Sequence, residues 1–386
     1  MGAPRLLGST EAGASASLVR PPGPLFGDGP IRPAGRWQDG RVAGVARSMG
    51  ARHSAGTGPD SGRVYQIPLR TRFRGVTVRQ GLVWRGAAGW AEWSPFLDYG
   101  PDEARIWLRA AMESADIGWP DPVRATVPVN CTIPAVDPEV AYAMAAGSGC
   151  TTAKVKVAEQ GQGLADDLNR VEAVRHALGP TGQVRVDANG AWDVDAARAA
   201  IRQLARFDLE YVEQPCAHVD ELAELRRRLA RDGIGVLIAA DESIRRSNDP
   251  YRVAELRAAD VVVLKVQPLG GVRACLQIAE RIGLPVVVSS ALETSVGIRA
   301  GLALAAALPE LRYACGLNTV PLLTDDLVES SLVATGGHLT VRDLVVDPLG
   351  LSSAAAPSDV MQAWWTRLGE VQRAMAEMPS GEGRIV

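Results

Sequence analysis

The three lysines of this chain are the residues whose type and spacing point most directly to chemistry. The chain has 386 residues and 41 Lys and Arg, yet its only lysines are Lys154, Lys156 and Lys265. Arginine stays protonated at any biological pH, whereas a lysine can lose its proton when its surroundings lower its pKa. Where arginine otherwise supplies the positive charge, the retained lysines are candidates for a base. Chance placement is the alternative, and the residues between the lysines argue against it.

Three acidic residues lie between these lysines, each at the end of a short apolar run. Asp187 ends Val-Arg-Val-Asp, Glu213 ends Tyr-Val-Glu, and Asp241 follows Ile-Ala-Ala. An acid after a strand is often only the N-cap of the next helix, so one such residue would mean little. Three in succession, flanked by every lysine of the chain, predict a shared site.

Converging carboxylates favour a bound cation, because like charges at short range repel one another. A few carboxylate oxygens, with positions left for water or substrate, suit Mg2+, with Mn2+ as a substitute. Calcium prefers more protein oxygens, and zinc prefers His or Cys, neither of which ends these runs. We therefore predict a magnesium site formed by Asp187, Glu213 and Asp241.

The lysines would then act on a substrate bound at that metal. Lys154 and Lys156 are two residues apart on a predicted strand, so both side chains point to one face. Mutual repulsion, burial and a nearby metal favour loss of a proton, which would make Lys156 a general base tuned by Lys154. Lys265 is expected on the opposite wall. A carboxylate substrate held between them would lose its α-proton to give an enediolate, which the metal stabilises.

Short β-branched runs alternate with Ala, Leu and Arg-rich helical segments from about Val127, which predicts a parallel sheet. The predicted strands are Val127–Ile133, Thr152–Val157, Val184–Ala188, Leu209–Glu213, Val236–Ala240, Asp260–Val266, Val286–Ser290 and Arg312–Cys315. Eight repeats are typical of a TIM-like barrel, whose strands place their C-terminal ends at one mouth. A doubly wound sheet is the alternative, but no Gly-rich phosphate turn follows the first strand.

The segments on either side of the barrel are expected to be a smaller α+β unit. Strands are predicted at Tyr65–Leu69, Arg72–Arg79 and Gly81–Trp84, and helices at Asp102–Ala115 and Val360–Met378. Residues 321–355 look irregular, with a hairpin around Gly336 and Gly337. The predicted divisions are residues 63–126, 127–320 and 321–386.

Residues 1–62 are dense in Gly, Ala, Pro, Ser and Arg and show no periodic pattern. Such a segment buries too little apolar surface to offset its ordering entropy. We expect a disordered extension, or upstream sequence read from a start codon placed too early, with Met49 or Val64 as the true start.

Composition excludes several classes of partner. A net charge of -3 gives no reason to expect nucleic-acid binding, and no apolar run is long enough to cross a membrane. The N-terminus has no apolar core of a signal peptide, and the five dispersed cysteines include no CxxC pair. We expect a cytoplasmic protein with reduced thiols, whose partner is a small carboxylate, and the oligomeric state is left open.

These motifs together resemble the enolase superfamily, in its muconate-lactonizing-type subgroup, and within it most closely the o-succinylbenzoate synthase family. The resemblance extends from about Arg63 to Gly350. It is carried by these residues: Phe73-Arg74-Gly75, Gly89-Trp90-Ala91-Glu92, Lys154-Val155-Lys156, Asp187-Ala188-Asn189-Gly190, Glu213-Gln214-Pro215, Ala240-Asp241-Glu242-Ser243, Lys265, Gly270-Gly271, and Ser289-Ser290 with Glu293.

The resemblance implies a (β/α)7β barrel closed by a capping domain from the N- and C-terminal segments. It implies a lyase of menaquinone biosynthesis that dehydrates 2-succinyl-6-hydroxy-2,4-cyclohexadiene-1-carboxylate to o-succinylbenzoate. Lys156 would remove the α-proton and return it to the departing hydroxyl, while Lys265 stabilises the enediolate. Ser289, Ser290 and Arg74 are candidates for substrate binding, although strand-end hydroxyls often cap helices and exposed arginines are common in this chain.

Two other functions stay open at the level of sequence. An N-acylamino acid racemase or dipeptide epimerase would use the same two opposed lysines, because the fold and catalytic groups are shared. The stretch Cys315-Gly-Leu-Asn-Thr does not contain the acidic pair of many dipeptide epimerases, which lowers that option. The other open function is a non-catalytic ligand-binding barrel, and the retention of all three lysines argues against it.

Overall fold

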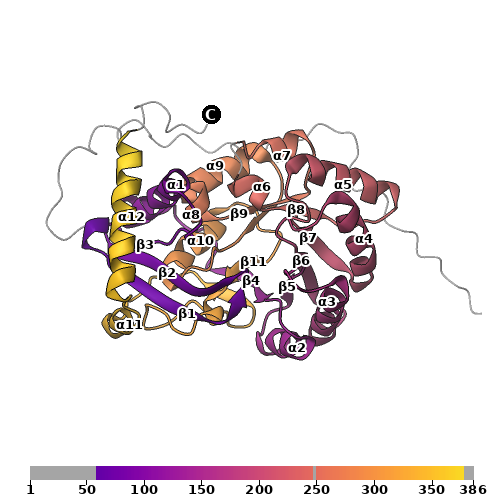
Figure 1. Ribbon diagram of the computed structural model, residues 1–386, viewed down its shortest axis with the longest axis horizontal. Coiled ribbons are helices and arrows are strands. Elements are labelled where there is room, and N and C mark those ends of the chain that lie inside the picture. The colour runs from indigo at the N-terminus through magenta and orange to yellow at the C-terminus, as the bar shows by residue number, and fades with distance from the viewer. Residues whose placement is uncertain (1–57, 247–248, 378–386) are drawn as a thin grey trace, which may run out of the picture. The chain divides into compact units, whose positions relative to one another are not determined.

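Eight parallel strands form the centre of the fold in the computed structural model, which describes residues 58–246 and 249–377 (Figure 1). They are β4 (Thr126–Ile133), β5 (Thr152–Lys156), β6 (Gln183–Asp187), β7 (Leu209–Glu213), β8 (Ile238–Ala240), β9 (Val261–Leu264), β10 (Val286–Val288) and β11 (Cys315–Asn318). Their hydrogen-bonded order is β10-β9-β8-β7-β6-β5-β4-β11. A parallel bridge between Ser289 and Gly316 joins the two end strands, so the ring closes as the predicted barrel.

Helices connect successive strands and cover the outside of the ring, as Figure 1 shows for α2 to α5. They are α2 (Pro138–Gly147), α3 (Leu164–Leu178), α4 (Val194–Leu204), α5 (Val219–Arg231), α6 (Glu242–Arg245), α7 (Arg252–Glu255), α8 (Val266–Leu269), α9 (Val272–Ile282) and α10 (Ser295–Ala307). In α4, Ala197, Ile201 and Leu204 form the buried stripe, and the Asp193 side chain caps the first turn. Past β11 the chain turns into η5 (Val320–Leu322), so the order is the predicted (β/α)7β.

Of the barrel strands, only β7 has the predicted bounds at both ends, and β8, β9, β10 and β11 differ from theirs by two residues or more at one end or both. β8 begins at Ile238, β10 ends at Val288, and β11 begins only at Cys315, where the prediction ends. Arg312 instead pairs with Glu310 at the surface, and the ladder with β4 starts at Cys315 opposite Val129. The buried run Cys-Gly-Leu-Asn was missed because it contains no β-branched residue.

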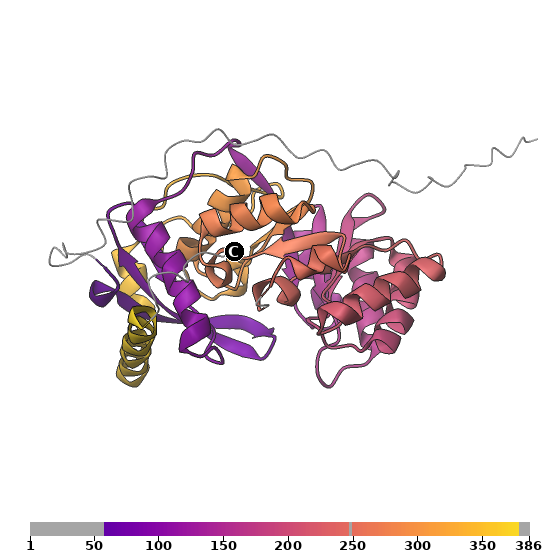
Figure 2. The ribbon, with the colours of Figure 1, turned by 90° about the horizontal axis from the view of Figure 1, so that it is seen from above.

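A second layer, which we call the cap, joins segments from both ends of the described chain. Its N-terminal elements are β1 (Arg63–Phe73), β2 (Val76–Arg85), β3 (Trp90–Trp93), α1 (Pro101–Met112) and the π-helical turn η3 (Glu113–Ile117). Its C-terminal elements are α11 (Pro348–Ser353) and α12 (Ser358–Ala376). Figures 1 and 2 show α12 beside α1 and the β1–β2 ribbon, and Trp364 of α12 lies edge-on to Trp93. The two-part capping layer is therefore confirmed.

The strands of the cap were predicted in the right number but with wrong bounds. The reversal lies at Arg74 and Gly75, whose φ angles are 51° and 79°, inside the strand predicted over Arg72–Arg79. β2 then runs through Gly81, where a side chain would meet the ring of Tyr65 and the side chain of Ser94. The third strand is Trp90–Trp93, in a stretch given no strand by the sequence.

The hairpin predicted around Gly336 and Gly337 and the predictions for residues 1–62 have separate outcomes. Gly336 and Gly337 form a tight turn with a bridge between Thr335 and His338, but β12 (His338–Thr340) pairs with β4. Of residues 1–62, only 58–62 are described, and they hold a short 3-10 turn, η2 (Pro59–Ser61). The rest lies outside the described residues, and the domain divisions stay predictions. Within the described ranges, no helix is long and apolar enough to cross a membrane.

Two carboxylates of the cap accept hydrogen bonds from the backbone amides that begin two consecutive barrel helices. Glu113 accepts hydrogen bonds from the amides of Val272 (2.6 Å) and Arg273 (3.2 Å) at the start of α9. Glu92 accepts from the amides of Thr294 (3.2 Å) and Gly297 (3.0 Å) at the start of α10. Because unpaired amides and the helix dipole favour negative charge there, these contacts fix the cap on the barrel.

A substitution at Gly297 would test how closely the cap and barrel pack together. A Cβ at this position would lie 2.6 Å from Glu293 Cβ and 3.0 Å from Glu92 Oε2. We expect Gly297→Ala to lower the free energy of unfolding by about 1–3 kcal/mol, because the junction must shift to make room. The matched control is Gly147→Ala at the end of α2, where an added Cβ meets no atom within 4 Å. Equal urea midpoints for both variants would contradict the close fit.

Candidate active site

The strands bring the six predicted residues together at one mouth of the barrel. Lys154 and Lys156 end β5, Asp187 ends β6, Glu213 ends β7, and Asp241 and Lys265 follow β8 and β9. Register aligns Lys156 with Asp187 and Asp187 with Glu213. All six are buried, with 0% to 7% of each residue exposed. Their predicted convergence is therefore present in the structure.

Each carboxylate of this group contacts a lysine. Lys154 Nζ donates to Glu213 Oε1 at 2.8 Å and Oε2 at 3.0 Å, and lies 3.2 Å from Asp187 Oδ2. Lys156 Nζ donates to Asp187 Oδ2 at 2.5 Å and to Asn189 Oδ1 at 2.8 Å. Lys265 Nζ donates to Asp241 Oδ2 at 2.7 Å. The six groups form a balanced cluster of three ammonium groups and three carboxylates.

This cluster separates the pKa values of its two neighbouring lysines. Burial, with Lys154 and Arg74, lowers the pKa of Lys156 to about 8, although Asp187 opposes the shift. Burial also disfavours the charge of Lys154, but Glu213 and Asp187 outweigh it and raise that pKa. Burial and the charge of Asp187 raise the pKa of Glu213 to about 7. Lys156 is thus the lysine nearer to losing its proton at neutral pH.

Lys156 and Lys265 lie on opposite walls of the mouth. The ring order places β6, β7 and β8 between β5 and β9, so the two lysine strands are four positions apart. The three carboxylate strands fill the arc between them. A small substrate in the mouth can therefore meet one ammonium group from each side.

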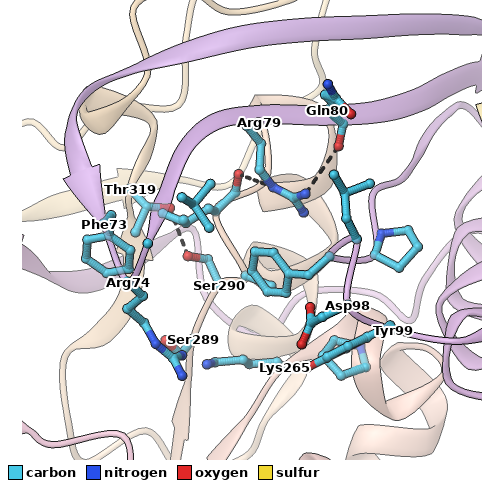
Figure 3. A pocket seen from close by; sticks show the side chains of 18 of the residues that line it. Phe73, Arg74, Arg79, Gln80, Asp98, Tyr99, Lys265, Ser289, Ser290 and Thr319 are labelled. Carbon is cyan, nitrogen blue, oxygen red and sulfur yellow. Dashed lines mark hydrogen bonds between the residues drawn. The ribbon is translucent and has the colours of Figure 1, made fainter. Parts of the chain in front are cut away.

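A cavity of about 580 Å³ opens above the lysines and is closed from the other side by the cap. All three lysines line it, and Figure 3 shows Lys265 with Arg74 and Ser289 along one wall. Arg74 also pairs with Glu242 at 3.2 Å, and Ser290 Oγ lies 2.8 Å from Thr319 Oγ1. The three predicted substrate contacts all line the cavity, and their roles stay predictions.

Several residues of the mouth were not predicted. The Phe73 ring centroid lies 5.1 Å from Lys156 Nζ, and Asn189, with φ of 49°, reaches the same ammonium group. Arg245 Nε donates to Asp241 Oδ1 at 3.0 Å, and Arg245 also contacts Tyr99 of the cap. Asn189 follows Asp187 by two residues, which could have signalled it. Arg245 is one turn beyond Asp241, but arginine is too common in this chain to be noticed.

The mouth offers oxygen donors of the kind that bind a metal ion. As the side chains stand, no three His, Cys, Asp or Glu residues of the described part are arranged to hold one. The lysine ammonium groups lie among these carboxylates instead, with Nζ atoms 2.5–3.2 Å from the carboxylate oxygens. Asn189 Nδ2 and Glu242 Oε2 are buried beside the cluster, and neither has a hydrogen-bond partner among the residues that the structure describes. Three carboxylates, with the unpartnered Glu242 oxygen nearby, fit a hard divalent cation, which takes oxygen ligands.

A second buried charge group lies where the cap meets the barrel. Glu92 and Glu293 are 3% and 4% exposed, and Arg79, at 3%, supplies the positive charge. Burial, with the charge of Glu92, raises the pKa of Glu293 to about 7, and Arg79 opposes the shift. Burial raises the pKa of Glu92 as well. The charge of Arg79 therefore opposes the raised pKa of both carboxyl groups, and Glu293 is the one poised to hold a proton.

Comparison with known proteins agrees with this fold. The family described as Enolase C-terminal domain-like matches residues 138–351, and the family described as Enolase N-terminal domain-like matches residues 64–115. Among solved structures, the muconate lactonizing enzyme from Pseudomonas fluorescens aligns with a TM-score of 0.66 at 23% identity. It covers 76% of this chain and 98% of its own, and at that identity it shows the fold alone.

Curated relatives are much closer in sequence. The o-succinylbenzoate synthase of Thermobifida fusca is 60% identical over 84% of this chain and 99% of the relative. The o-succinylbenzoate synthase of Mycolicibacterium smegmatis is 53% identical over 78% of this chain and 92% of the relative. This chain belongs to the enolase superfamily and, within it, to the o-succinylbenzoate synthase family. The predicted superfamily and family are thus confirmed, and enzymes of this superfamily generally depend on a divalent metal.

Glu293 gives the stability of the fold a definite pH dependence. Its pKa is about 7 in the folded chain against an ordinary 4.5, so the folded state binds its proton more tightly. The stability from this protonation is complete below the ordinary pKa and is lost as pH rises through about 7. We expect Glu293→Gln to gain stability relative to the wild type between pH ~5 and pH ~8, by at most about 3 kcal/mol.

Urea unfolding at a series of pH values measures this difference. The matched control is Glu280→Gln on the exposed side of α9, which should follow the wild-type pH profile. A wild type and a Glu293→Gln variant with parallel stability profiles would contradict the raised pKa.

Proposed function

We propose that this chain dehydrates 2-succinyl-6-hydroxy-2,4-cyclohexadiene-1-carboxylate to o-succinylbenzoate, as a carbon–oxygen lyase of menaquinone biosynthesis. The observation that carries the proposal is the opposed pair Lys156 and Lys265 above a cluster of three carboxylates. Relatives named o-succinylbenzoate synthase at 50–60% identity over most of the chain support the choice of reaction. A small carboxylate substrate also agrees with a buried, cation-lined cavity.

Lys156 would perform both proton transfers. Its neutral amine takes the proton from C1, next to the ring carboxylate, and the electron pair moves into that carboxylate to give an enediolate. When the enediolate collapses, the C6–OH bond breaks, and the Lys156 ammonium gives its proton to the departing hydroxyl. The products are water and an aromatic ring, and the lysine returns to its neutral form. The lowered pKa of Lys156, about 8, suits a group that acts as base and then acid.

The other two lysines would assist without moving a proton. Lys265, from the opposite wall, places a positive charge beside the carboxylate oxygens as they gain negative charge. Lys154 stays protonated between Glu213 and Asp187, so its charge disfavours a second ammonium group at Lys156. Phe73 lies over Lys156 and limits access of water to it.

Asp187, Glu213 and Asp241 would hold Mg2+, for which Mn2+ can substitute. When bound, the metal would supply a Lewis acid that lowers the cost of negative charge on the substrate carboxylate. With Asp187 and Asp241 engaged in this way, the Lys156 and Lys265 side chains would be free to face the substrate. Asn189 and Glu242, whose buried Nδ2 and Oε2 have no partner among the described residues, would hydrogen bond around the same centre.

Ser289, Ser290 and Arg74 would contact the substrate outside the reacting carbon. The two hydroxyls stand at the end of β10 on the cavity wall, and Arg74 stands on the turn between β1 and β2. Arg74 is also the residue whose charge, from the cap, reaches Lys156 and Asp187. A substrate with two carboxylates suits this excess of cations.

A racemase that uses the same two lysines is the second candidate. One aligned structure is the N-succinyl Arg/Lys racemase from Bacillus cereus, with a TM-score of 0.64 at 19% identity, covering 77% of this chain and 97% of its own. That likeness concerns the fold. The chemical reason is that opposed bases on either face of a carbon also permit 1,1-proton transfer.

A dehydration assay with purified protein and Mg2+ separates the candidates. The cyclohexadiene substrate is followed by its absorbance, and N-succinyl amino acids are incubated in parallel in deuterated water. Rapid dehydration that EDTA abolishes and Mg2+ restores supports the proposal. Deuterium incorporation into an N-succinyl amino acid without dehydration would contradict it and favour the racemase.

Lys156→Arg tests the base directly. Arginine preserves the charge and most of the volume but cannot be neutral at working pH, so we expect folding to persist and kcat to fall about 10²–10⁴-fold. The chain offers no lysine outside the site, so the control is Arg202→Lys on the exposed side of α4. Substantial dehydration by the Lys156→Arg protein would exclude Lys156 as the base.

A further inference from the structure

Arg79 is a cap residue that lines the cavity, and its guanidinium donates to three backbone carbonyls. It lies on β2 and is 3% exposed. Its Nε donates to Leu292 O at 3.1 Å, its Nη1 donates to Gln80 O at 3.2 Å, and its Nη2 donates to Ser94 O. Figure 3 shows the first two of these bonds. Its guanidinium also stacks 4.7 Å from the centre of the Phe96 ring.

The carbonyl of Leu292 belongs to the loop that follows β10, residues 289–294, which we call the β10 loop. Leu292 has φ of 63°, a left-handed conformation that is unusual for a branched side chain. Such a conformation persists only where the surroundings hold it. Arg79 holds it at the carbonyl, and Glu293 Oε2 accepts the amide of Ala291 at 2.6 Å.

The β10 loop faces both the cap and the substrate cavity. The Leu292 side chain packs into a core with Tyr65, Ile67 and Val83 of the cap. Ser289, Ser290, Ala291 and Leu292 at the same time line the cavity. A change in how this loop meets the cap therefore changes the cavity wall.

The Ser94 carbonyl connects the same arginine to the wall that carries Lys265. The Ser94 amide donates to Gln267 Oε1 at 3.2 Å, and Gln267 lies two residues after Lys265. Ser94 Oγ donates to Glu92 Oε1 at 2.7 Å, and Glu92 holds the start of α10. Arg79 thus contacts the β10 loop directly through the Leu292 carbonyl. It reaches the segment after β9 only indirectly, because Ser94, whose carbonyl it binds, donates to Gln267.

We propose that Arg79 is a positioning residue that sets the shape of the cavity wall formed by the β10 loop. It does so through the Leu292 and Ser94 carbonyls, without binding the substrate itself. The proposal deepens the proposed function, because this wall would face the part of the substrate remote from C1. A lysine cannot replace it, since a single ammonium group cannot reach three carbonyls that diverge from a planar guanidinium.

The test compares Arg79→Lys and Arg79→Met with Arg85→Lys, a control at the exposed end of the same strand. Binding is measured for o-succinylbenzoate and for 2-butanoylbenzoate, in which a methyl group replaces the distal carboxylate. We expect Arg79→Lys to weaken both ligands at least ~10-fold and equally, and to raise KM far more than it lowers kcat. Mn2+ affinity, followed by electron paramagnetic resonance, should stay within about two-fold of the wild type, as should every property of Arg85→Lys.

A loss confined to o-succinylbenzoate would mean that Arg79 binds the distal carboxylate directly, which would overturn the proposal. Unchanged affinity for both ligands would overturn it too.

Amide hydrogen exchange gives a readout that needs no substrate. In Arg79→Lys, the amides of residues 289–297 should exchange at least ~5-fold faster than in the wild type, while those of β6 and β7 stay protected. Unchanged exchange at residues 289–297 overturns the positioning role. If the wild type neither dehydrates the substrate nor binds o-succinylbenzoate, the proposed function fails, and exchange alone still decides the role of Arg79.

Discussion

The pairing of buried lysines with buried carboxylates at the barrel mouth is the constraint on which the rest of the structure depends. An ionised side chain taken out of water costs several kcal/mol unless an opposite charge and hydrogen bonds compensate it. The mouth holds six such groups, and each lies next to an opposite charge from an adjacent strand or the strand beyond it. The register that aligns Lys156, Asp187 and Glu213 is therefore as important to stability as to chemistry.

The same constraint governs how the proposed metal would bind, because each buried charge of the mouth needs an opposite charge beside it. Each ammonium group now compensates a carboxylate, and a divalent cation could take over that role for all three. Arg245 adds a further positive charge beside the cluster, where it contacts both Asp241 and Glu242. Charge balance is thus maintained by neighbours on several strands rather than by a single pair.

Cap and barrel are joined by the same kind of interaction, with carboxylates directed at helix starts. Glu92 and Glu113 come from the cap, and each satisfies amides that begin a barrel helix. Arg79 adds a positive charge that opposes the raised pKa values of Glu92 and Glu293, and its bond to the Leu292 carbonyl extends the junction to the cavity wall. The substrate cavity is consequently shaped by both layers, although its ionic centre belongs to the barrel.

The sequence was informative where function restricted residue type. The rare lysines and the acids at successive strand ends revealed the mouth, because each stands at the end of an apolar run. The closed ring followed from the alternation of strands and helices. Elements whose residues carry no such signal were missed, including Cys315–Asn318, which lacks β-branched residues, and the reversal at Arg74-Gly75. Arg79 and Arg245 were missed because tertiary contacts, not local sequence, distinguish them from the other arginines.

A crystal structure with Mg2+ and o-succinylbenzoate would test the central claim most directly. We predict that the metal lies among Asp187, Glu213 and Asp241, with the benzoate carboxylate between Lys156 and Lys265 and the succinyl chain beside the β10 loop. A metal bound elsewhere, or a ligand that leaves the lysines paired with their carboxylates, would contradict the assignment of this mouth as the reaction centre.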